Sequence, residues 1–66
     1  MKTWAQQPQG TRSRVIQSLR DDARLLRHDW PDDRALLEHA DALASLADYL
    51  ERIEPSIRKQ HERGAP

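Results

Sequence analysis

Three histidines are the residues of this 66-residue chain that could bind a metal ion. His28 and His39 are eleven positions apart on different predicted helices, and His61 lies near the end of the chain. Tight sites on helices usually take their ligands from positions i and i+4 of one face, and these histidines offer no such pair. The chain has no cysteine, which excludes thiolate sites and disulfides. We therefore expect no metal and no cofactor, and we expect His39 to be a neutral histidine facing the core.

Carboxylate pairs could act as acid and base in an enzyme, but here they stand at adjacent positions, in Asp21–Asp22 and Asp32–Asp33. Adjacent residues of a helix point in different directions, and a helical domain this small offers no cleft that would desolvate them. No serine has a histidine at a helical spacing that suits a catalytic triad. We expect these acids to form a solvated polar face and to cap helices. The sequence therefore predicts no enzyme and no small-molecule substrate.

The elements around these residues are predicted to be helices. Over the first half of the chain, apolar residues recur at alternating steps of three and four, which is the spacing of one helix face. These residues are Ile16, Leu19, Ala23, Leu26 and Trp30. We predict a helix over 13–28, preceded by a flexible arm over 1–11 that has no periodicity.

Two prolines punctuate the rest of the chain. Pro31 suits the first turn of a helix, so a second helix is predicted over 31–54, with Asp29 or Trp30 as its N-cap and Asp32 reaching back as in a capping box. One long helix kinked at Pro31 is the alternative, disfavoured because an interior proline costs about 3 kcal/mol. Pro55 ends or kinks this helix, a short continuation over 55–61 is plausible, and 62–66 is predicted to be a flexible tail. The helical hairpin would span 12–61.

The second helix is apolar around most of its circumference, and such a helix is usually buried on more than one side. One row is predicted to form the hairpin core: Leu36, Leu43, Leu46, Leu50 and Ile53. A second surface, together with Trp30, is predicted to contact another chain: Leu37, Ala40, Ala44, Ala47 and Tyr49. The predicted fold is all-α, an antiparallel two-helix hairpin that dimerises into a four-helix bundle. The alternative is a monomer whose tails cover the second surface.

The net charge is zero, yet its distribution is uneven. Met1–Arg20 holds four bases and no acid, whereas Asp21–Glu54 holds ten acids and four bases. In an antiparallel hairpin the two basic chain ends meet at one pole, which could bind the phosphates of a nucleic acid. The residues concerned are Arg12, Arg14, Arg20, Arg58 and Lys59. Equally, these bases could pair with Glu51 and Glu54 at the helix ends.

In length and helix pattern the chain resembles two families of short helical hairpins. One is the plasmid copy-number protein that binds paired RNA loops as a four-helix dimer, and the other is the co-chaperones of type III secretion needles, which clamp a partner. No diagnostic residue of either matches, so no site carries over. The leading hypothesis is a homodimeric interaction protein, an adaptor, regulator or inhibitor that binds another protein as well. The alternatives are a nucleic-acid-binding regulator and a co-chaperone-like subunit folded only with its partner.

The sequence also bears on where the protein works. No stretch approaches the roughly 20 apolar residues of a membrane span. A signal peptide has an apolar run after its basic start, and Met1–Gly10 has no such run after Lys2. Arginine far outnumbers lysine, which is typical of GC-rich bacterial genomes. We therefore expect a soluble bacterial protein of the cytoplasm, with no contact with membranes.

Overall fold

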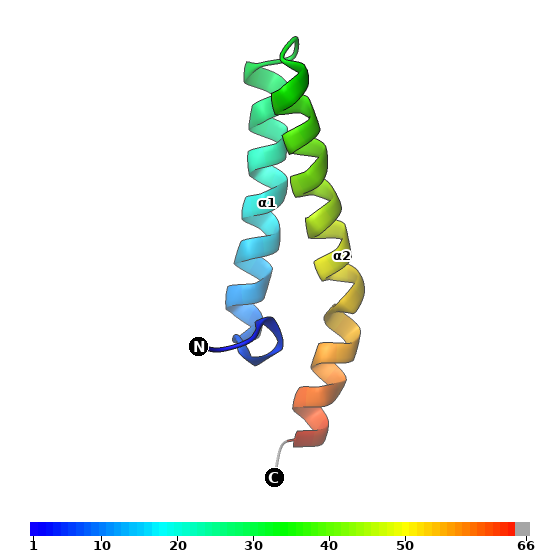
Figure 1. Cartoon of the computed structure of the whole chain (residues 1–66). Helices are drawn as coiled ribbons and strands as arrows, with labels where there is room; N and C mark the ends of the chain where they lie inside the picture. Colours follow the sequence, from blue (N-terminus) through cyan, green and yellow to red (C-terminus); the bar gives the residue numbers. More distant parts are fainter. Residues whose placement is uncertain (65–66) are drawn as a thin grey trace.

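Two long helices lie side by side and run in opposite directions in the computed structural model (Figure 1), which describes residues 1–64. A short 3-10 turn, η1 (Trp4–Gln6), precedes α1 (Gln9–Asp29) and α2 (Arg34–Gly64). The molecule measures 52 × 19 × 16 Å, and both chain ends lie at the same pole. We call this pole the open end and the opposite pole, at residues 30–33, the turn end. The predicted all-α hairpin is confirmed for the described residues.

The first helix is longer than its sequence pattern predicted. It begins at Gln9 directly after Pro8, whose fixed φ suits a helix start, so residues 9–11 of the predicted arm belong to the helix. It ends at Asp29, where the N–H of Trp30 still donates to the carbonyl of Leu26 at 3.0 Å. Pro31 follows one residue later and stops the helix, as predicted.

The second helix starts three residues later than predicted. Asp33 is its N-cap: the carboxylate accepts the N–H of Leu36 at 3.1 Å, and its carbonyl accepts the N–H of Leu37 at 2.9 Å. The assignments of Pro31 to the first helical position and of Asp32 to a capping box are therefore wrong. Residues 30–33 form the turn instead, because reversing the chain between two antiparallel helices requires a few non-helical residues.

Pro55 does not end α2, which runs on to Gly64. Proline lacks the N–H that would bond to the preceding turn, and Figure 1 shows α2 curving along this part of its length. Ile57 lies two residues further on and is 5% exposed, so the continuation packs against the rest of the hairpin. The continuation over 55–61 is present, and residues 62–64 of the predicted tail belong to it; Ala65 and Pro66 lie outside the described residues.

The seam between the helices keeps Leu43 and Leu50 of the predicted core row of α2, but it uses Ala40 and Ala47 in place of other predicted positions. Ala40 and Ala47 are 0% exposed, whereas Leu46 is 46% exposed and His39 is exposed. Leu46 and His39 were predicted to face the core, and both predictions are wrong. The buried row also alternates by three and four, but it contains positions 40, 47 and 54 in place of 39, 46 and 53. Alanine is suited to this row because its small methyl group lets the backbone of α1 approach closely. The positions of the row are Ala40, Leu43, Ala47, Leu50, Glu54 and Ile57.

The cap of α2 can be tested at a single position. Asp33→Ala removes the side chain that accepts the N–H of Leu36 and should lower the free energy of unfolding by about 1 kcal/mol. Asp33→Asn removes the same charge but keeps an acceptor, so it should cost close to nothing. Urea denaturation followed by circular dichroism measures both. Equal losses in the two variants would show that Asp33 acts through its charge and not as a cap.

Candidate interaction face

One long side of the hairpin is bridged by ion pairs. Arg20 of α1 contacts Asp48 at 3.0 Å and Glu51 at 2.8 Å, and Arg27 contacts Asp41 at 2.6 Å. These groups are one-third to three-quarters exposed, so each pair adds little stability. Their effect is to make this side polar, with the charges of Arg20 and Arg27 paired within the hairpin.

The opposite side is apolar towards the turn end. Leu25, Trp30 and Leu46 are 57%, 49% and 46% exposed, although each is large and apolar. Leu26 and Leu43 are half-buried between them. A shallow hollow here is lined by Asp22, Leu25, Leu26, Trp30, His39 and Leu43. We call Leu25, Leu26, Trp30, His39, Leu43 and Leu46 the apolar face.

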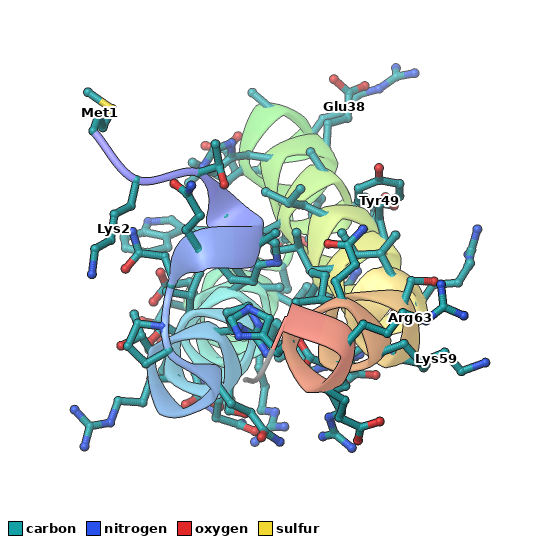
Figure 2. The ribbon with its side chains drawn as sticks, turned by 90° about the horizontal axis from the view of Figure 1, so that it is seen from below. Met1, Lys2, Glu38, Tyr49, Lys59 and Arg63 are labelled. Atoms are coloured by element: carbon teal, nitrogen blue, oxygen red, sulfur yellow. The ribbon has the colours of Figure 1, made fainter. Side chains whose placement is uncertain are left out.

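The structure separates the residues predicted to form the second surface. Ala40 and Ala47 are fully buried against α1, so they belong to the core, and their assignment to the surface is corrected. Leu37 is half-buried, and so is Ala44, which lies beside Arg20 and Arg24 on the polar side. Tyr49 is 55% exposed and points away from the helices (Figure 2). Of the predicted set, Trp30 lies within the apolar face and Tyr49 stands at position i+3 from Leu46, at its edge.

The N-terminal segment covers the hairpin at the open end. Trp4 packs against the core cluster of Ile16, Ala47 and Leu50, next to Ile53, which lies seven residues after Leu46 on the same stripe. Figure 1 shows the segment at the start of α1, on the side that faces α2, where the two helices diverge. The sequence predicted a flexible arm here, but the structure has its residues 3–7 folded against the hairpin.

Two further contacts fix this segment, and one group in it is unpaired. The Nε2 of His61 lies 2.6 Å from the carbonyl oxygen of Ala5, and the side chain of Gln6 accepts the N–H of Thr3 at 2.9 Å. The buried indole N–H of Trp4 has no acceptor within residues 1–64. A buried donor without a partner costs free energy, which offsets part of what burying the indole ring contributes.

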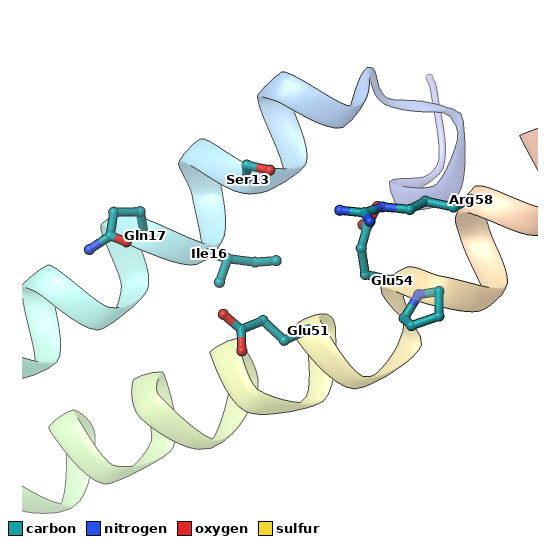
Figure 3. Close-up of a pocket in the computed structure, with 7 residues that line it drawn as sticks. Ser13, Ile16, Gln17, Glu51, Glu54 and Arg58 are labelled. Carbon is teal, nitrogen blue, oxygen red and sulfur yellow. The ribbon is translucent and has the colours of Figure 1, made fainter.

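A buried ion pair lies under this segment. The guanidinium of Arg12 is 2% exposed and donates from Nε and Nη2 to the two carboxylate oxygens of Glu54, both at 2.8 Å. Its Nη1 donates to the carbonyl of Gln7, and Arg58 reaches the same carboxylate at 3.3 Å (Figure 3). The hydrogen bonds from Arg12 hold the pKa of Glu54 below its usual range, although burial opposes this, and the pKa of Arg12 is raised.

The candidate nucleic-acid residues are mostly engaged within the chain. Arg12 and Arg58 pair with Glu54, and Arg20 pairs with Asp48 and Glu51. Arg14 and Lys59 are exposed and form no ion pair within residues 1–64. The alternative that the bases of the open end pair with Glu51 and Glu54 is therefore confirmed for Arg12, Arg20 and Arg58.

Within residues 1–64 no three histidine, aspartate or glutamate side chains gather as metal ligands would. None of the helices over the same residues is long and apolar enough to cross a membrane.

The chain matches no protein-family model, no curated protein and no solved structure. Its function therefore has to be argued from its own surface.

The buried ion pair predicts a dependence of stability on pH. The pKa of Glu54 is lowered by folding, so the pair contributes its full stability above the pKa of a free glutamate. That contribution is lost as the pH falls through the lowered pKa. Glu54→Gln should therefore lower the melting temperature at neutral pH, and the gap to the unaltered protein should narrow in acid.

Glu62→Gln makes the same change on the same helix, at an exposed residue that forms no ion pair within the described part of the chain, and serves as the control. Thermal denaturation by circular dichroism between pH 2 and 7 measures all three proteins. A Glu54→Gln gap that stays constant over this range would contradict the role given to the pair.

Proposed function

We propose that this protein is a non-enzymatic interaction module that binds through its apolar face, and that a second copy of the chain is its first partner. The observation that supports this most directly is the gathering of Leu25, Trp30 and Leu46 on one side of the hairpin, each about half exposed. Large exposed apolar side chains that gather on one side of a protein mark a site of contact, and Leu25 and Trp30 line one hollow there. Adaptors, regulators and inhibitors are proteins that act through such a surface.

Two features of the hairpin favour contact on this side. On the polar side, Arg20 and Arg27 already pair with acids of the facing helix. The apolar face has aliphatic and aromatic side chains and a hollow, with Asp22 at its rim. Trp30 is the residue type that most often anchors an interface, because its large ring can be buried while its N–H bonds to a partner.

A second copy is the simplest partner on physical grounds. A two-fold axis brings the same face of two chains together, so a single contact covers the exposed apolar side chains of both chains. A chain of this length buries a small core, and pairing two hairpins into a four-helix bundle increases the burial per chain. A different protein with a matching helix would compete with the second copy for the same face.

A nucleic-acid regulator is supported less well, since Arg12, Arg20 and Arg58 are paired and Arg14 and Lys59 alone remain for phosphates among the candidates. The alternative of a subunit folded only with its partner would give weak helicity in the isolated chain. Circular dichroism of the isolated chain tests the partner-dependent subunit, and a gel-shift titration at two salt concentrations tests the nucleic-acid regulator.

Leu46→Glu tests the proposal. Leu46 is 46% exposed in one hairpin, so a glutamate there leaves the fold intact but places a charge within the proposed contact. The unaltered protein should have twice the 7.7 kDa mass of one chain, and the variant should have the mass of one chain with the same helicity. Light scattering coupled to size exclusion, from micromolar to millimolar concentrations, measures the masses.

Ser45→Glu is the matched control, since it introduces the same side chain one position away at an exposed residue outside the apolar face. It should leave the mass doubled. A stable, helical monomer at every concentration of the unaltered protein would refute self-association. Equal masses for Leu46→Glu and Ser45→Glu would show that the contact lies elsewhere.

A further inference from the structure

The charges of the hairpin are separated along its 52 Å axis. The part nearest the turn end, residues 21–41, holds seven acids and three bases. The part nearest the open end, residues 1–20 and 48–64, holds eight bases and four acids. Each molecule therefore has an acidic pole and a basic pole. When two copies lie side by side, either like poles or opposite poles are neighbours.

The apolar face does not lie midway between the poles. The N-terminal segment, with Trp4, packs against the core at the open end, and the exposed residues of the apolar face lie between the turn and Leu46. Val15 and Tyr49, at 37% and 55% exposure, lie further towards the open end. The contacts of Arg27 with Asp41 and of Arg12 with Glu54 show which residues of the two helices lie at the same height. By this register the centre of the apolar face lies near Leu43.

Two symmetric arrangements can bring two such faces together. In a parallel pair, the two-fold axis runs along the hairpins and places one acidic turn beside the other. In an antiparallel pair, the axis passes through the faces near Leu43, and each turn lies beside the partner at about the height of its residues 53 and 54. Both arrangements cover the apolar faces equally well, so the charges decide between them.

We infer that two copies pair antiparallel, the acidic turn of each lying against the basic open end of the other. This inference rests on the proposed self-association. Asp29 and Asp32 at the turn then approach Arg14 of the second copy, an exposed base that forms no ion pair within residues 1–64. Opposite charges attract over the ~10 Å range that ordinary salt allows, whereas the parallel pair would hold two acidic turns together.

The distance between the two turns tests this arrangement. The chain has no cysteine, so Asp32→Cys provides one site for a spin label in each copy. Asp32 is exposed, eleven residues before Leu43. With a rise of about 1.5 Å per residue on either side of the axis, antiparallel pairing predicts about 35 Å between the labels. Parallel pairing predicts about 10–20 Å, the spacing of neighbouring helices in a bundle.

Ala42→Cys is the matched control, because this exposed position lies next to the proposed axis. Labels there should be close in either arrangement, which confirms that a dimer is being measured. Pulsed electron spin resonance reads both distances. A close Ala42 pair with a close Asp32 pair would overturn the antiparallel arrangement and leave self-association standing. No defined distance at either position, with a monomeric mass, would overturn both.

Charge reversal gives an independent readout. Asp32→Lys places a base opposite the basic end of an antiparallel partner, so the dissociation constant should rise roughly fivefold. Sodium chloride should weaken the unaltered dimer for the same reason. A parallel dimer would respond in the opposite sense to salt, since screening would relieve the repulsion between its acidic turns. Tighter association in salt would therefore refute the inference.

Discussion

Close contact through alanine sets the geometry on which the rest of this hairpin depends. Ala23 of α1 and Ala40 and Ala47 of α2 are buried at the seam, at 2%, 0% and 0% exposure. Small side chains there allow the helices to approach closely, and the larger Leu46 of α2 is turned outward as a consequence. The contribution of Leu46 to the apolar face thus follows from the use of alanine at the seam.

The open end is held by a different kind of interaction. The helices diverge there, and the N-terminal segment fills the space with Trp4 while Arg12 joins α1, α2 and that segment through Glu54 and Gln7. A buried pair of this kind adds less stability than its short distances suggest, because both charges lose water. It does fix the register, since a buried arginine without its carboxylate would be strongly unfavourable. The register in turn determines which charges lie at which pole.

The sequence was sufficient for the two helices, their antiparallel order and the stop near Trp30, because spacing and Pro31 act locally. It was not sufficient for the phase of α2. The rows through Leu46 and through Ala47 both alternate by three and four, and only the size of the side chains facing them decides which row is buried.

The docking of Trp4 has no periodic signal, and the tolerance of Pro55 depends on packing by Ile57. Trp30 and Tyr49 were predicted as surface residues, and both are exposed. The sequence also left Arg12 and Arg20 as candidate phosphate ligands, because their pairing with Glu54, Asp48 and Glu51 depends on how the two helices pack.

The most direct test of this account is the effect of enlarging the seam alanine. Ala47→Leu should lower the free energy of unfolding by about 1–3 kcal/mol, because a larger side chain at a fully buried contact forces the helices apart. Ser45→Leu, at an exposed residue of the same helix outside the apolar face, should cause no comparable loss. Chemical denaturation at fixed protein concentration measures both. An Ala47→Leu protein as stable as the original, or more so, would mean that Ala47 does not face α1 and would contradict the arrangement described here.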